Sequence, residues 1–166
     1  VLVTVNTNYK SNELEYILHQ SDSTTLVLME GYRDTNFYAI TREVIPELDR
    51  CAPGRTESDT LPFLKNVVYI GDRKETPGMF SFDDVLRMGS GVSDRELEER
   101  ENSVHFHDVV NMQYTSGTTG FPKGVMLTHY NIINNARMVG DVMGMTPRDR
   151  LLIQVPLFHC FGCVMS

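Results

Sequence analysis

The stretch Tyr114-Thr115-Ser116-Gly117-Thr118-Thr119-Gly120-Phe121-Pro122-Lys123-Gly124-Val125 decides how the surrounding chain can fold. Apolar residues recur at alternate positions leading into it, at Val110, Met112 and Tyr114, which predicts a strand. A short apolar run over 125–127 follows the stretch and predicts a second strand. The stretch is therefore expected to be a glycine-rich loop that joins two strands.

The chemistry of this loop favours phosphate binding. Positive φ and close approach of the backbone to a ligand are open to its glycines: Gly117, Gly120 and Gly124. Successive N–H groups in such a turn can form an anion-binding nest. Hydroxyls that can donate to phosphate oxygens or bind a metal come from four side chains: Thr115, Ser116, Thr118 and Thr119. Lys123 adds a mobile positive charge, and Pro122 stiffens the backbone before it.

Two well-known phosphate patterns do not fit the loop. The P-loop pattern needs a glycine directly before the lysine, where this sequence has Pro122. The dinucleotide pattern fails because Thr119 stands at its second glycine position after Gly117. The alternative without function is a polar surface turn with an incidental lysine. The complete ten-residue string from Thr115 to Gly124 disfavours that alternative.

The residues before the loop predict alternating helices and strands. Ser11 can cap a helix with one apolar face, Leu14, Ile17 and Leu18. Strands are expected over 25–29 and 66–70. Asp34 can cap a second helix, which Pro46 should kink or shorten.

Two further helices are predicted closer to the loop. One begins at Ser81 and ends at Gly89, with Val85 and Leu86 facing inward. Residues 93–96 have the spacing of a capping box before a charged stretch, which is expected to be a solvated surface helix or linker.

The residues after the loop predict one more helix and one more strand. Thr128 can cap a helix that ends near Gly144, with an apolar face of Ile132, Ala136, Val139 and Met143. A last strand is expected over 151–155, stopped by Pro156. Together these elements predict an α/β fold with a mainly parallel, buried sheet flanked by helices.

Composition narrows the function classes. The formal net charge of −7 argues against broad nucleic-acid binding. No apolar run approaches the ~20 residues of a membrane span. Three cysteines in 166 residues do not make a disulfide scaffold, so a soluble, cytoplasmic protein is expected. The chain opens on Val1 without Met and stops at Ser166, and we expect it to be an excised piece of a longer protein.

The loop, with its flanking Tyr114 and Val125, closely resembles the phosphate-loop signature of the adenylate-forming superfamily. Downstream, Val155-Pro156-Leu157-Phe158-His159-Cys160-Phe161-Gly162 resembles a motif of the medium- and long-chain fatty-acid–CoA ligases. Residues 5–9, 13–16 and 62–71 are similar to the same family. The resemblance implies that residues 1–166 are part of a large N-terminal AMP-binding domain, without the adenine-binding motif and the C-terminal domain.

The resemblance also implies a reaction. A carboxylate attacks the α-phosphorus of ATP, pyrophosphate leaves, and CoA then takes the acyl group. The loop residues would hold the β- and γ-phosphates: Thr115, Ser116, Gly117, Thr118, Thr119, Gly120, Lys123 and Gly124. Lys123, acting electrostatically, and Thr119 would be catalytic, and Thr118 or Thr119 could bind Mg²⁺. Phe158 and His159 would line the acid pocket.

The same resemblance defines the expected ligands. They are small molecules, namely a carboxylic acid that is expected to be a fatty acid, ATP with Mg²⁺, and CoA, while the remaining partner is the rest of the protein's own chain. Because the groups that hold adenine and ribose are not in it, the 166-residue chain alone is expected to be inactive.

Other interpretations of single residues stay open. Cys160 and Cys163 form a C-x-x-C that could indicate zinc or redox chemistry, but a second ligand pair is missing and buried apolar cysteines are favoured. His105 and His107 have no partner cluster. The alternative functions are a peptide-synthetase adenylation domain, a luciferase-like enzyme, and a nucleotide-binding module without catalysis.

Overall fold

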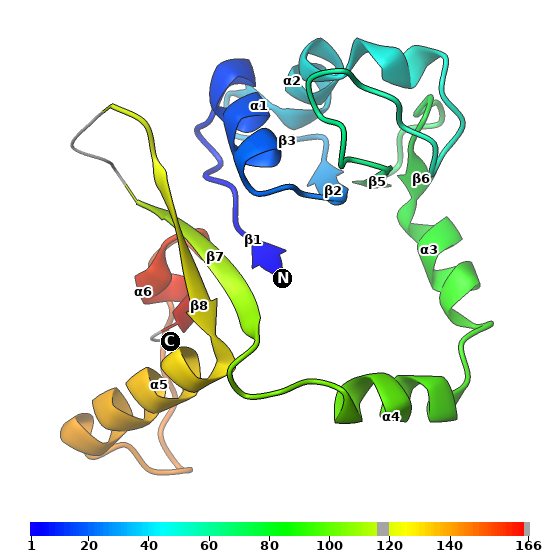
Figure 1. Ribbon diagram of the computed structural model, residues 1–166. Coiled ribbons are helices and arrows are strands. Elements are labelled where there is room, and N and C mark those ends of the chain that lie inside the picture. The colour runs from blue at the N-terminus through cyan, green and yellow to red at the C-terminus, as the bar shows by residue number, and fades with distance from the viewer. Residues whose placement is uncertain (116–119, 165–166) are drawn as a thin grey trace. The chain divides into compact units, whose positions relative to one another are not determined.

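Helices and strands alternate along the chain, so the α/β class is confirmed (Figure 1). The computed structural model describes residues 1–115 and 120–164. Contacts divide the chain into two compact units. We call Thr7–Glu99 the parallel-sheet unit, and we call Val1–Asn6 together with Arg100–Ser166 the hairpin unit.

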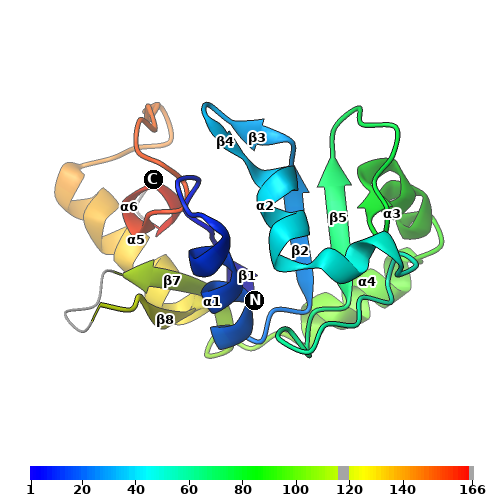
Figure 2. The ribbon, with the colours of Figure 1, turned by 90° about the horizontal axis from the view of Figure 1, so that it is seen from above.

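The parallel-sheet unit is built on three parallel strands in the order β2-β5-β6: β2 (Thr25–Met29), β5 (Asn66–Ile70) and β6 (Phe80–Ser81). The predicted strands over 25–29 and 66–70 are thus confirmed, and Figure 2 shows them side by side. A parallel pair cannot be joined by a tight turn. The connection from β2 to β5 accordingly carries a short antiparallel pair, β3 (Gly31–Tyr32) with β4 (Thr35–Asn36), and then a helix.

Helix α1 (Ser11–Gln20) buries the face that the sequence predicts, whereas the caps of both α1 and α2 (Phe37–Val44) differ from those predicted. Helix α1 buries Leu14, Ile17 and Leu18, but its N-cap is Lys10, whose N–H donates to Glu13 Oε2 at 3.0 Å. Helix α2 is capped by Asn36, whose Oδ1 accepts from the Ala39 N–H at 2.7 Å. Asp34 does not cap it because Asp34 lies in the turn between β3 and β4. A 3-10 helix, η1 (Pro46–Asp49), begins at Pro46, so the predicted shortening of α2 is confirmed.

The most deeply buried aliphatic side chains of this unit form its core: Ile17, Ile45, Leu48, Leu61, Leu64 and Val67. Each is at most 2% exposed, and burial of one such side chain contributes about 1.5–3 kcal/mol. Helix α3 (Phe82–Gly89) begins at the predicted cap, Ser81. The expectation that Leu86 faces inward is wrong, because that side chain is 58% exposed. Helix α4 (Asp94–Asn102) is exposed, as its charged sequence predicts.

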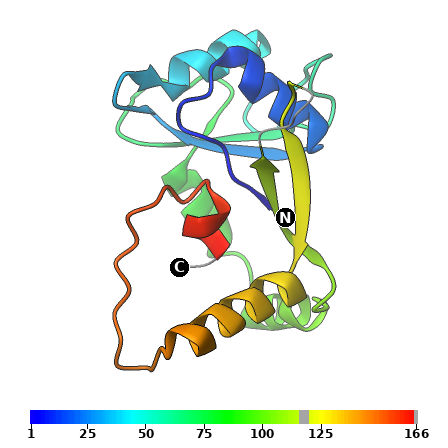
Figure 3. The same ribbon diagram turned by 90° about the vertical axis from the view of Figure 1, so that its left-hand side faces the viewer.

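The hairpin unit is built on a sheet in the order β1-β7-β8. Strand β7 (Val109–Thr115) pairs antiparallel with β8 (Lys123–Thr128) and parallel with β1 (Leu2–Val3). Helix α5 (His129–Met143) follows β8, begins at the predicted cap Thr128 and ends at Gly144, which has a φ of +63°. Figure 3 shows the segment after α5 returning to the short helix α6 (Cys160–Val164).

The predicted strand over 151–155 is not formed. Leu151, Leu152 and Ile153 are 48%, 76% and 46% exposed, and no described strand pairs with them. An apolar run becomes a strand only when a neighbouring strand supplies hydrogen bonds, and the described residues contain none for this run. The predicted parallel sheet also forms as two separate sheets, of which β1-β7-β8 is mixed. Within the described residues, no helix is long and apolar enough to cross a membrane.

A polar cluster forms just beyond the carboxyl ends of β2 and β5. The guanidinium of Arg73 binds Glu30 with two bonds, Nη2 to Oε1 at 2.6 Å and Nε to Oε2 at 3.0 Å. The Tyr69 hydroxyl donates to Glu30 Oε2 at 2.8 Å, and the Arg73 guanidinium lies 4.0 Å from the centroid of the Tyr38 ring. The Arg73 and Tyr69 hydrogen bonds lower the pKa of Glu30 from 4.5 to about 2.

This cluster predicts how stability depends on pH. A carboxylate with a lower pKa in the folded state stabilises that state above its unfolded pKa, and the contribution disappears as the pH falls through the folded pKa. Glu30→Gln should therefore lower the free energy of unfolding at neutral pH, and its difference from the unsubstituted protein should narrow between pH 4.5 and about 2. Urea unfolding across this range measures the difference. Glu57→Gln, at an exposed position, is the control, and a Glu30→Gln difference that stays constant with pH would contradict the prediction.

Candidate phosphate and acid site

The predicted phosphate loop lies at the tip of the β7–β8 hairpin. Strand β7 ends at Thr115, strand β8 begins at Lys123, and these two residues are directly opposite each other in the ladder. Directly opposed residues of an antiparallel pair project from the same face of the sheet. The Thr115 hydroxyl and the Lys123 ammonium, both on exposed side chains, therefore share one face. The predicted site residues Ser116, Gly117, Thr118 and Thr119 lie outside the described residues.

The two described loop glycines have different roles. Gly120 has a φ of +92°, and an added Cβ would meet no described atom within 4 Å, so the backbone conformation alone favours glycine there. Gly124 lies inside β8 opposite Tyr114 and does not use the positive φ that glycine permits. Outside residues 116–119 and 165–166, no hydrogen bond or ion pair engages the Lys123 ammonium. A cation in this state is suited to binding an anion that approaches from solvent.

The second predicted segment forms a tight turn that holds His159. The His159 N–H donates to the Pro156 carbonyl at 3.0 Å, and the His159 carbonyl accepts from the Gly162 and Cys163 amides at 2.9 and 3.0 Å. The Phe161 N–H donates to His159 Nδ1 at 3.2 Å. Because Nδ1 is the acceptor in this bond, a neutral ring carries its proton on Nε2, which can donate to a ligand.

Phe158, the other predicted acid-pocket residue, is half-buried. Its carbonyl accepts a hydrogen bond from Thr4 Oγ1 at 3.2 Å. Thr4 directly follows β1, which pairs with β7. The turn with Phe158 and His159 is therefore attached to the same sheet as the predicted phosphate loop.

Two buried amides on β7 were not predicted. Asn111 and Gln113 are each 3% exposed, whereas the apolar residues Val110, Met112 and Tyr114 on the other face are half-buried. Gln113 Nε2 donates to Asn111 Oδ1 at 2.8 Å. Asn111 Nδ2 donates to Cys163 Sγ at 3.8 Å, which places α6 on the Asn111 side of the strand. The available signal was the alternation of amide with apolar residues, which locates a strand but does not say which face is buried.

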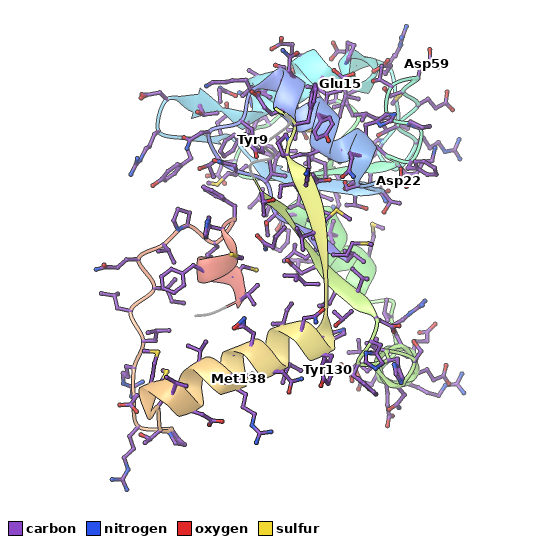
Figure 4. All side chains as sticks on the ribbon, turned by 60° about the vertical axis from the view of Figure 1, so that its left-hand side comes forward. Tyr9, Glu15, Asp22, Asp59, Tyr130 and Met138 are labelled. Carbon is purple, nitrogen blue, oxygen red and sulfur yellow. The ribbon has the colours of Figure 1, made fainter. Side chains whose placement is uncertain are left out.

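The cysteine and histidine predictions have mixed outcomes. Cys160 is exposed and Cys163 half-buried, so burial of both is wrong, and α6 begins at Cys160. No group of three metal-ligating side chains occurs within the described ranges. His105 and His107 contact Phe106, with ring centroids 4.2 Å away in each case. The ring of Tyr130, at the start of α5 in Figure 4, lies 5.6 Å from His107, so these histidines belong to an aromatic cluster.

Known proteins resemble the whole chain. A family model described as AMP-binding enzyme matches residues 1–166. The chain is 54% identical over 166 residues to "Putative acyl-CoA synthetase YngI" of Bacillus subtilis (strain 168), with 100% of this chain and 30% of that protein covered. It is 37% identical over 171 residues to "Medium-chain acyl-CoA ligase ACSF2, mitochondrial" of Macaca fascicularis, with 99% and 27% covered.

A solved structure with the same fold is that of the anthranilate CoA ligase AuaEII in complex with anthranoyl-AMP. Its TM-score is 0.72 at 26% identity, with 98% of this chain and 27% of that chain covered. The chain thus spans under a third of the length of these relatives.

Gly162 gives the turn a steric requirement that can be tested. A Cβ at Gly162 would lie 2.9 Å from the carbonyl carbon of Pro156, against its oxygen, and 3.0 Å from the Val155 oxygen. These are backbone atoms, so the turn itself would have to move. Gly162→Ala in the full-length protein should therefore lower stability by about 1–3 kcal/mol, as overpacking does.

The matched control is Gly89→Ala at the end of α3, where an added Cβ meets no described atom within 4 Å. This control should leave stability unchanged or raise it slightly, because alanine favours a helix over glycine. Thermal melts of both variants make the comparison. Equal melting temperatures for the two would refute the tight packing assigned to the turn.

Proposed function

We propose that this chain, which belongs to the AMP-binding enzyme family, is part of an AMP-forming acid–CoA ligase. The reaction joins a carboxylic acid to ATP, with formation of acyl-AMP and release of pyrophosphate. The thiol of CoA then displaces AMP and takes the acyl group. Residues 1–166 are proposed to be part of the N-terminal AMP-binding domain, and the groups that bind adenine and ribose are proposed to come from other parts of the protein.

The observation that carries this proposal is the arrangement at the hairpin tip. Thr115 and Lys123 meet on one face at the two ends of a glycine-bearing turn, and Gly120 has the positive φ that such turns use. A hydroxyl and an ammonium that share one face match the oxygens of a polyphosphate in charge and hydrogen bonding. Lys123 stabilises the charge that develops on the pyrophosphate leaving group, without transferring a proton.

The remaining loop residues complete the proposed phosphate site. The β- and γ-phosphates are proposed to be held by Thr115, Ser116, Gly117, Thr118, Thr119, Gly120, Lys123 and Gly124, and Thr119 is proposed to be catalytic together with Lys123. Mg²⁺ would supply positive charge that offsets the charge of the phosphates. The hydroxyl of Thr118 or Thr119 is proposed as its protein ligand.

The acid is proposed to bind at the turn that carries Phe158 and His159. His159 is exposed, and its Nε2–H is available to a carboxylate or an acyl phosphate oxygen. Two relatives support an acyl substrate, since one is named an acyl-CoA synthetase and the other a medium-chain acyl-CoA ligase. We therefore propose a fatty acid as substrate. We also propose that the reaction takes place in the cytoplasm, although the ACSF2 relative is named as mitochondrial.

The proposed reaction is tested with the full-length protein. Incubation with ATP, Mg²⁺, CoA and a panel of fatty acids should release AMP and pyrophosphate and form acyl-CoA. Residues 1–166 alone should give no turnover. Correct orientation of the two reactants, the acid and ATP, accounts for roughly 7–11 kcal/mol of barrier lowering. Residues 1–166 are proposed to supply only some of the groups that orient them.

Other results would assign another function. Turnover of amino acids with a carrier-protein thiol, and of no fatty acid, would indicate a peptide-synthetase adenylation domain. ATP binding without pyrophosphate release from any acid would indicate a nucleotide-binding module.

The role of Lys123 is tested by substitution in the full-length protein. Lys123→Ala should slow ATP–pyrophosphate exchange by about 10²- to 10³-fold, the range for loss of one preorganised electrostatic contact to a transition state. The melting temperature should stay unchanged, because the Lys123 side chain is exposed. Lys74→Ala, at an exposed lysine of the parallel-sheet unit, should keep full exchange. Unchanged exchange in Lys123→Ala would remove Lys123 from the proposed site.

A further inference from the structure

The two buried amides of β7 have no role in the reaction proposed above. Asn111 and Gln113 are each 3% exposed, and they are the two buried positions of β7. Burial of a carboxamide is unfavourable unless its polar atoms find hydrogen-bond partners. The hydrogen-bond partners of these amides therefore show which neighbouring element is bonded to β7.

Their partners form a chain that crosses from β7 to α6. Gln113 donates to Asn111 at 2.8 Å, and Asn111 donates to the sulfur of Cys163 at 3.8 Å, within range for a sulfur acceptor. Cys163 is also tied through its backbone, because its N–H donates to the His159 carbonyl at 3.0 Å. The chain of hydrogen bonds therefore links Gln113 to the backbone of His159.

The same face of β7 continues to the phosphate loop. Side chains two residues apart on a strand share a face, so Asn111, Gln113 and Thr115 form one row. Thr115 is directly opposite Lys123. The row thus runs from the contact with α6 at Asn111 to the loop residues at Thr115, roughly 13 Å away at 3.3 Å per residue.

We propose that Asn111, Gln113 and Cys163 form a positioning relay that fixes the His159 turn relative to the phosphate-binding tip of the same strand. The inference rests on the proposed ligase function, since it concerns how that site brings acid and ATP together. Hydrogen bonds are directional, so a bonded chain fixes the position of α6 more narrowly than apolar contact. Reacting groups that are misplaced by 1 Å can lose about 10²-fold in rate, which gives such a relay a catalytic consequence.

The first test compares two substitutions of the thiol in the full-length protein. Cys163→Ala removes the acceptor, whereas Cys163→Ser replaces it with a hydroxyl of similar size. Cys163→Ala should lower kcat/KM for the acid about two- to tenfold, the effect of one hydrogen bond, while KM for ATP stays unchanged. Cys163→Ser should restore most of the loss. Cys51→Ala, in the parallel-sheet unit, is the cysteine control.

A double substitution tests whether the amides and the thiol act as one unit. Gln113→Met keeps the approximate volume and removes the donor to Asn111. If the relay is real, Gln113→Met combined with Cys163→Ala should lose little more than the larger single loss. The proposal would be overturned if the loss of kcat/KM in the double variant equalled the product of the two single losses. It would also be overturned if KM for the acid and KM for ATP changed equally, or if Cys163→Ala had no kinetic effect.

A chemical measurement tests the relay without ligase activity. In the native full-length protein, the rate of Cys163 alkylation by iodoacetamide is followed by peptide mass spectrometry, with Cys51 as internal reference. Gln113→Met should raise the Cys163 rate about two- to tenfold, because Asn111 loses the bond that orients it. An unchanged ratio of the two rates would overturn the relay. A raised ratio in a protein that activates no acid would retain the relay and reject the ligase proposal.

Discussion

The antiparallel ladder between β7 and β8 is the constraint on which the candidate site depends. It places Thr115 opposite Lys123 and thereby joins both ends of the glycine-bearing stretch at one hairpin tip. Without that pairing, a hydroxyl and an ammonium eight positions apart in sequence would have no common face. The pairing of β1 with β7 adds a third strand, and Thr4, which follows β1, holds the carbonyl of Phe158. Strand β7 is therefore connected both to the proposed phosphate site and to the proposed acid site.

The hairpin unit combines a polar interior with a large exposed apolar surface. Its most buried strand positions are the amides Asn111 and Gln113, whereas Val142 on α5 is 89% exposed. The parallel-sheet unit has the opposite character, with an aliphatic core and its main polar cluster around Glu30 at the surface. A fully hydrogen-bonded polar network makes the arrangement of the elements that it joins more rigid and more specific. This contrast is consistent with a site that is built on the hairpin unit.

Family membership and geometry contribute different parts of the functional argument. The match over residues 1–166 places the chain among AMP-binding enzymes. The chain spans 30% of the YngI relative, so the acid and its activation are proposals for the whole protein. The geometry adds that the predicted phosphate loop and the His159 turn belong to one unit, and that a chain of hydrogen bonds links Gln113, two residues before Thr115 on β7, to the His159 turn.

Local signals in the sequence determined the elements and the motif, while long-range contacts decided burial and pairing. Ser81, Thr128 and Gly144 end or begin helices as predicted, because a cap acts within a few residues of the backbone it satisfies. The α/β class and the hairpin around the loop follow from similarly local periodicity. The run over 151–155 failed as a strand, and Asn111 turned inward, for a different reason. A strand forms only when a neighbouring strand pairs with it, and a side chain is buried only when another element packs over it. Both conditions depend on tertiary structure.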